Sequence, residues 1–182
     1  MKDKISIIVG GTGQFGIYLS QLLLKKKYKV IITTRNLKSA RRKIPFKDKN
    51  LILKKIDILN QNQIKNVILK SNPQSIFYFA SQSSPKLSFT KKKETFDSNY
   101  IGCKNFLETI YKEKINCKFI NATSSEIFSE TTEKIKLYFK KKPISPYGKA
   151  KLMSFNETRN YRNLKKIKAY NAIIFNTESV LR

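Results

Sequence analysis

A tyrosine and a lysine four positions apart, Tyr147 and Lys151, have the clearest capacity for acid–base chemistry in this sequence. In a helix this spacing places both side chains on one face. A lysine ammonium beside a phenol stabilises the phenolate, so we expect the pKa of Tyr147 to lie below the usual value of about 10. A tyrosine with such a pKa can accept and donate protons near neutral pH. The spacing alone is common, so its meaning depends on the residues around it.

A hydroxyl and a carboxylate, Ser124 and Glu126, follow a predicted strand at 117–122. The hydroxyl can hydrogen-bond a substrate oxygen beside the tyrosine, and the carboxylate can remove a proton from carbon. The alternative for Glu126 is a helix-capping or solvated acid. The sequence contains no histidine, which excludes imidazole catalysis and histidine metal ligands.

Near the N-terminus, an apolar, β-branched run breaks into Gly10, Gly13 and Gly16, and an amphipathic helix is predicted to follow. In a dinucleotide-binding turn the first glycine permits the tight bend, and the second lets backbone N–H groups approach a pyrophosphate. The third lets helix and strand pack closely. The helix N-terminus presents free N–H groups and partial positive charge to the phosphates. The motif therefore predicts a dinucleotide site; the alternative is a glycine-rich turn without a ligand.

The end of the second predicted strand, 29–34, indicates which dinucleotide binds. A carboxylate at this point binds the ribose 2′-hydroxyl of NAD, whereas an arginine accommodates the 2′-phosphate of NADP. No acidic residue stands there, and Arg35 is followed closely by Arg41 and Arg42. The sequence favours NADP over NAD, unless these arginines are ordinary surface cations.

Apolar runs alternate with helical patterns along the whole chain, from 1 to 182. The expected strands are 5–9, 29–34, 51–56, 75–80, 117–122 and 170–175. The longest expected helices are 92–113 and 147–165, whereas 36–50 is a loop or short helix and 129–143 an exposed loop. This alternation predicts a single α/β domain, a doubly wound parallel sheet of about six strands with helices on both faces.

The chain carries 38 lysines and arginines against 12 acidic residues, a formal charge of +26. Such a charge is compatible with a nucleic-acid partner. Because the lysines are spread over the whole chain, we favour instead a compositional bias that fills solvated faces. No apolar run reaches the length of a membrane span. Cys103 and Cys117 lack the spacing of a metal or redox site, so we expect no metal, and two core thiols in a reducing cytoplasm.

Together, the glycine turn, the T-S-S-E segment at 123–126 and the S-P-Y-G-K-A-K segment at 145–151 resemble the extended short-chain dehydrogenase/reductase family. Within it they are most similar to the GDP-mannose 4,6-dehydratases. The loop at 80–83 and the segment at 173–179 are similar as well. The resemblance runs over the whole chain but implies only the cofactor half of such proteins, a Rossmann-type domain without the family's C-terminal substrate domain.

The resemblance implies an internal hydride cycle on a nucleotide sugar, GDP-mannose, with tightly bound NADP and loss of water. Tyr147 would take the proton of the sugar 4-hydroxyl, and Lys151 would hold the nicotinamide ribose. Glu126 would remove the C5 proton, and Ser124 matches the family's hydroxyl position. Beside Tyr147 and Lys151, the implied cofactor residues are Gly10, Gly13, Gln14, Phe15, Gly16, Arg35, Asp57, Ile58 and Ala80. The implied substrate residues are Ser81, Gln82, Ser83 and Asn176.

Two other functions remain open on the sequence. An epimerase or 4-keto reductase of the same family needs no C5 base, so Glu126 separates these enzymes from a dehydratase. A non-catalytic basic module on the same fold would bind nucleic acid, with strong salt dependence, and not NADP. The family likeness also implies a homo-oligomer paired through the helices at 92–113 and 147–165. Two departures from the family pattern are Phe15 in place of an aspartate and Thr177 in place of a histidine.

Overall fold

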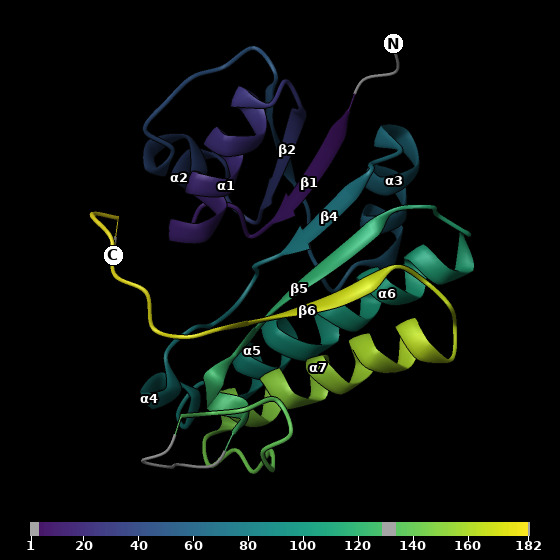
Figure 1. Cartoon of the computed structure of the whole chain (residues 1–182). Coiled ribbons are helices and arrows are strands. Elements are labelled where there is room, and N and C mark those ends of the chain that lie inside the picture. The colour runs from purple at the N-terminus through teal and green to yellow at the C-terminus, as the bar shows by residue number, and fades with distance from the viewer. Residues whose placement is uncertain (1–3, 129–133, 182) are drawn as a thin grey trace.

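Six parallel strands form one sheet in the computed structural model, which describes residues 4–128 and 134–181 (Figure 1). The strands are β1 (Ile5–Val9), β2 (Lys29–Thr34), β3 (Leu51–Lys55), β4 (Ser75–Tyr78), β5 (Lys118–Ser124) and β6 (Ala169–Ile174). Their order across the sheet is β3-β2-β1-β4-β5-β6. The chain therefore winds outward from β1 to β3 and then returns to the other side of β1. This reversal between β1 and β4 is the point where ligands bind in open α/β sheets.

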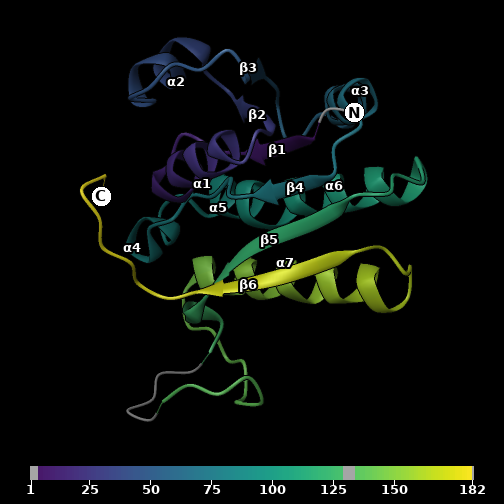
Figure 2. The same cartoon turned by 45° about the horizontal axis from the view of Figure 1, so that its top comes forward.

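Helices cover both faces of the sheet, as the alternation predicts. The helices are α1 (Gln14–Lys25), α2 (Leu37–Lys43), α3 (Gln61–Ser71), α4 (Pro85–Ser88), α5 (Lys92–Phe96), α6 (Gly102–Lys112) and α7 (Pro146–Asn163), with a π-helix η1 (Asp97–Ile101) and a 3-10 helix η2 (Ser125–Ile127). Helices α1 and α2 lie on one face near β1, β2 and β3, and α3, α6 and α7 lie on the other (Figures 1 and 2). The predicted fold class is confirmed.

The core has two parts because neighbouring residues of a strand point to opposite faces. In β1, Ile7 and Val9 pack with Phe106 of α6 in one cluster. Ile8 packs with Leu23 and Leu24 of α1 in the other. All three β1 side chains are fully buried, so this strand is covered on both faces. A strand buried in this way reads as a continuous apolar run, which is the pattern found here.

The predicted helix at 92–113 is interrupted by the π-helix η1. The N–H of Gly102 donates to the carbonyl of Asp97, five residues back, in place of the four-residue spacing of an α-helix. Helical periodicity in the sequence does not reveal this inserted residue, because the apolar face continues on both sides of it.

Other differences are small. The basic stretch at 36–50 contains α2, whose first turn is capped by the side chain of Asn36. A short helix that was not predicted, α4, begins with an N-cap serine, Ser84, and a proline at its first turn. In the expected loop at 129–143, the first five positions lie outside the described residues, and 134–143 has no helix or strand.

In Figure 2 the arrowheads of the strands point to one side, where α4 and the last residues of the chain also lie. The segment after β6 crosses this edge towards α1, and the side-chain amide of Gln14 donates to the Thr177 carbonyl at 3.4 Å. Within the described residues, none of the helices combines the length and hydropathy needed to span a membrane.

Candidate functional site

A cavity of about 960 Å³ opens at the carboxyl edge of the sheet, where all six strands end. Its size lies in the upper part of the range for small-molecule sites, about 300–1,000 Å³. The predicted cofactor residues that line it are Gly10, Gly13, Gln14, Phe15, Gly16, Arg35, Asp57, Ile58 and Ala80. The predicted substrate residues that line it are Ser81, Gln82, Ser83 and Asn176. Tyr147, Lys151 and Ser124 line it as well.

The three motif glycines differ in what surrounds them. Gly10 has a φ of +73°, and a Cβ there would lie 2.6 Å from the Cα of Ala80, so the bend and the close approach both require glycine. A Cβ on Gly16 would lie 2.4 Å from the Cα of Gly11. The absence of a side chain at Gly16 lets the first turn of α1 approach the turn after β1 closely.

Gly13 is the position that fits a bound pyrophosphate. A Cβ at Gly13 would meet no protein atom within 4 Å, and Gly13 lines the cavity. It is also the N-cap residue of α1, where no side chain caps the helix. The first backbone N–H groups of a twelve-residue helix are thus open to an anionic ligand. The turn has the space and the donors that the phosphates of a dinucleotide need.

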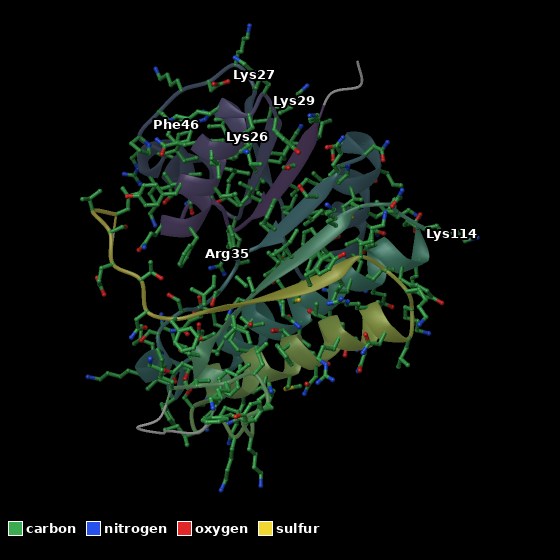
Figure 3. All side chains as sticks on the ribbon, viewed as in Figure 1. Lys26, Lys27, Lys29, Arg35, Phe46 and Lys114 are labelled. Atoms are coloured by element: carbon green, nitrogen blue, oxygen red, sulfur yellow. The ribbon has the colours of Figure 1, made fainter. Side chains whose placement is uncertain are left out.

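Arg35 stands at the carboxyl edge of the sheet, directly after β2 (Figure 3). Its guanidinium lies 3.6 Å from a carboxylate oxygen of Glu94, which reaches the same cavity from α5. Both side chains are exposed, so the pair contributes little to stability. No pattern in the sequence indicated Glu94, because Arg35 and Glu94 are far apart in the chain and meet only in the folded structure.

The start of α7 is built to place Tyr147 beside the end of β5. The hydroxyl of Ser145 accepts a hydrogen bond from the N–H of Gly148 at 3.0 Å, and Pro146 occupies the first turn. A Cβ on Gly148 would lie 2.4 Å from the carbonyl oxygen of Glu126, so η2 packs directly on this turn. Ser124, the last residue of β5, is thereby brought next to Tyr147.

Lys151 is almost fully buried, and its ammonium donates to the Ala122 carbonyl at 2.8 Å. Burial lowers the pKa of Lys151 to about 8. The ammonium nitrogen lies 5.7 Å from the centre of the Tyr147 ring. The lysine therefore contacts the ring and a backbone carbonyl.

The expected low pKa of Tyr147 is wrong for this structure. The pKa of the Tyr147 phenol lies above its usual value, mainly because the phenol is buried. Hydrogen bonding with Ser124 and Ser81 lowers this pKa, whereas the charge of Glu126 raises it. The upward shift of the pKa caused by burial is larger than the downward shift caused by the hydrogen bonds, because burial removes the charged phenolate from water.

Glu126 is the one predicted site residue that does not line the cavity. Its side chain is exposed, and its N–H donates to the Ser124 hydroxyl at 3.2 Å in the turn η2. Its charge nevertheless acts on Tyr147, so it lies at the rim of the site.

Several polar residues of α5 and η1 also line the cavity and were missed by the sequence reasoning. These are Lys93, Glu94, Asp97 and Ser98. Behind them Asn99 is buried and bonded to the loop that follows β4. The only signal in the sequence was an asparagine within an otherwise apolar helix face.

Comparison with known proteins places this geometry in a family. A model of the GDP-mannose 4,6 dehydratase family matches residues 7–182. A GDP-mannose 4,6-dehydratase of Vibrio cholerae is 30% identical over 195 residues, covering 100% of this chain and 52% of the relative. A GDP-mannose 4,6 dehydratase of Drosophila melanogaster is 33% identical, covering 100% of this chain and 49% of the relative. The chain thus spans about half the length of the curated relatives it matches.

Among solved structures, a UDP-glucose 4-epimerase of Brucella ovis in complex with NAD is similar, with a TM-score of 0.83. The likeness covers 95% of this chain and 52% of the epimerase at 20% identity, which establishes the shared fold. With the family match spanning nearly all of its residues, the chain belongs to the GDP-mannose 4,6-dehydratase family.

Proposed function

We propose that residues 1–182 form the dinucleotide-binding and proton-transfer domain of a nucleotide-sugar dehydratase that acts on GDP-mannose. The observation that carries the proposal is one cavity at the strand reversal, lined both by the glycine turn and by Ser124, Tyr147 and Lys151. Family membership supports a nucleotide sugar as the substrate. Because the relatives are about twice as long, the reaction is proposed for the protein in which this domain works.

The cofactor of this proposal is NADP. The absence of a carboxylate after β2 and the position of Arg35 at the cavity support a 2′-phosphate. The uncapped N-terminus of α1 and the open space at Gly13 support a pyrophosphate beside it. When bound, NADP supplies the hydride acceptor and donor that a dehydration without net oxidation requires.

The chain's own groups would move the protons. Tyr147 accepts the proton of the sugar 4-hydroxyl, and the Ser124 hydroxyl holds the same oxygen. Burial favours the protonated form of Tyr147, while its hydrogen bonds favour the ionised form. The balance between these effects sets the pH at which Tyr147 can act as a base. Lys151, buried at the cavity wall, supplies the ammonium that orients the cofactor ribose. Glu126, at the rim, removes the C5 proton.

The cofactor site is tested by titrating NADPH fluorescence with wild-type protein and with Gly13→Asp. A carboxylate in the space kept open at Gly13 repels phosphates, so we expect NADPH affinity to fall by about tenfold or more. Lys70→Gln, an exposed change far from the cavity, alters the net charge equally and is the control. Unchanged affinity in Gly13→Asp would show that the pyrophosphate lies elsewhere. Equal affinities for NADH and NADPH would remove the preference for NADP.

One observation favours a second function. Because Glu126 lies outside the cavity lining, an epimerisation or 4-keto reduction, which needs no C5 base, is the alternative. Glu126→Gln should abolish dehydration of GDP-mannose and leave NADPH affinity unchanged. If Glu126→Gln converts the nucleotide sugar as fast as the unaltered protein does, the reaction needs no C5 base at this position, which favours epimerisation or 4-keto reduction. Glu113→Gln is the control, because this carboxylate caps the C-terminus of α6, pairs with Lys65 and does not line the cavity.

The family likeness also supports a homo-oligomer that pairs through α5–α6 and α7. Light scattering of the purified protein tests this part of the proposal separately. A monomeric mass would contradict it and leave the cofactor site unaffected.

A further inference from the structure

The charged side chains that line the cavity are balanced in sign, although the chain as a whole is strongly basic. The cationic ones are Arg35, Lys93 and Lys151, and the anionic ones are Asp57, Glu94 and Asp97. The whole sequence has 38 lysines and arginines against 12 acidic residues, so the cavity wall is rich in carboxylates compared with the rest of the protein. A carboxylate beside a phosphate site opposes phosphate binding. The acidic residues of the wall therefore affect which anion the cavity accepts.

The cavity has two ends along the carboxyl edge of the sheet. Arg35 follows β2, whereas Lys151 donates to the Ala122 carbonyl in β5. These strands are three steps apart in the strand order, and the glycine turn after β1 lies between them. At about 4.8 Å per step, the two ends are about 14 Å apart. This order suits a dinucleotide with its pyrophosphate at the glycine turn, its reactive end beside Tyr147 and its adenosine ribose beside Arg35.

At the ribose end of this arrangement, the cation already has a carboxylate partner. A guanidinium nitrogen of Arg35 lies 3.6 Å from one carboxylate oxygen of Glu94, and the Lys91 ammonium lies 3.9 Å from the other. The Arg35 and Glu94 side chains are 75% and 42% exposed, so a ligand in the cavity can reach both. A phosphate that binds Arg35 must therefore share the guanidinium with Glu94 or displace it.

We propose that Glu94 is a specificity-determining residue of the dinucleotide site: as the ion-pair partner of Arg35, it limits the preference for a ribose 2′-phosphate over a ribose 2′-hydroxyl. A 2′-phosphate meets the negative charge of Glu94 and competes with it for the guanidinium. A 2′-hydroxyl carries no charge and can donate a hydrogen bond to a carboxylate. The inference rests on the proposed function in taking Arg35 as the place of the 2′ group.

A second carboxylate on the same wall provides a comparison. Asp97, in η1, pairs with the Lys93 ammonium at 2.5 Å, and both side chains line the cavity. Replacing Asp97 removes one negative charge from the wall and leaves the pair of Arg35 with Glu94 in place. The comparison therefore separates the effect of the Arg35 partner from the effect of the total charge of the cavity.

The experiment measures the dissociation constants of NADPH and NADH by fluorescence titration at one fixed salt concentration. Glu94→Gln keeps the size of the side chain and removes its charge, so we expect NADPH affinity to rise by about three- to tenfold. NADH affinity should not rise, so the ratio of NADPH affinity to NADH affinity increases. Asp97→Asn should increase this ratio less. Glu113→Gln, an equal change of charge at a residue that does not line the cavity, should leave the ratio unchanged.

Arg35→Gln separates this inference from the proposed function. If Arg35 receives the 2′-phosphate, loss of its guanidinium should weaken NADPH binding and leave NADH binding nearly unchanged. If Arg35→Gln lowers the ratio and Glu94→Gln does not raise it, the NADP site stands and the role of Glu94 falls. If neither dinucleotide binds, or if neither variant changes the ratio, both proposals fall.

Two further outcomes would overturn the role of Glu94. An equal increase of the ratio in Asp97→Asn and Glu94→Gln would make the total charge of the wall the cause. An increase in Glu94→Gln without any effect of Arg35→Gln would show that the ion pair is not the cause. Far-UV circular dichroism of each variant establishes that a changed affinity does not come from unfolding.

Discussion

Lys151 is the residue whose environment differs most from that of an ordinary lysine. Its ammonium is buried and has the Ala122 carbonyl as its hydrogen-bond partner. Because burial disfavours the charged form, its pKa is about 8, compared with 10.5 for a solvated lysine. Between these pH values the unfolded chain binds a proton that the folded chain does not. Stability therefore rises with pH across this window, and below about pH 8 the full cost of burying the charge is present.

Replacing Lys151 with methionine should stabilise the fold at pH 7, by an amount on the order of 2 kcal/mol. The gain should shrink as pH rises towards 10.5, because wild-type Lys151 then loses its proton. Urea unfolding of both proteins at pH 7 and pH 10 measures the difference. Lys70→Met, at an exposed position, is the control. A difference that stays constant between the two pH values would show that the buried charge is not its cause.

Among the elements, the π-helix decides how the site is built. It places Ser98 and Asn99 against the loop after β4. The Tyr78 hydroxyl occupies the space beside Gly102, because a Cβ on Gly102 would lie only 2.3 Å from the hydroxyl oxygen. Local unwinding of a helix at a functional site is a recurring use of π-turns. Here it aligns polar groups of one long helical stretch with the cavity.

Tyr78→Phe tests this element. Removing the fully buried Tyr78 hydroxyl leaves the Ser98 carbonyl without this donor. We expect a loss of about 1–2 kcal/mol in the free energy of unfolding, measured with urea. Tyr18→Phe, on the exposed side of α1, should cost much less. Equal effects of the two changes would mean that the bond to η1 contributes nothing specific.

At the scale of the whole molecule, the protein carries a formal charge of +26 and has a cavity suited to an anion. A dispersed positive field attracts any polyanion, whereas the turn at Gly13 offers a defined place for phosphates. Loose attraction and specific binding can therefore occur on the same protein and differ in their response to salt.

Raising NaCl from about 50 to 200 mM should weaken binding of duplex DNA far more steeply than binding of NADPH, because DNA releases more counterions. Gel-shift and fluorescence titrations at each salt concentration give the two slopes. Gly13→Asp should reduce NADPH affinity and leave DNA affinity nearly unchanged. Salt-dependent DNA binding without measurable NADPH binding would instead support the basic-module alternative.

The sequence by itself determined the six strands, most of the helices and the fold class, but not α4 or the π-helix η1. β-Branched runs and helical periodicity are local signals, so the strands and helices could be located from neighbouring residues, and their alternation predicted a parallel sheet with helices on both faces. The glycine turn and the pair Tyr147 and Lys151 were visible for the same reason, since each motif lies within one element and its flanks.

Only the tertiary structure decided which groups meet. The ion pair of Arg35 with Glu94 and the bond of Ser81 to Asn99 join segments far apart in the chain. The sequence also predicted a lowered pKa for Tyr147 from the lysine four residues away, whereas burial raises it. Desolvation depends on everything that packs around a side chain, and no local spacing records it. The chemistry of a site is set by its surroundings in three dimensions, while its scaffold follows from patterns along the chain.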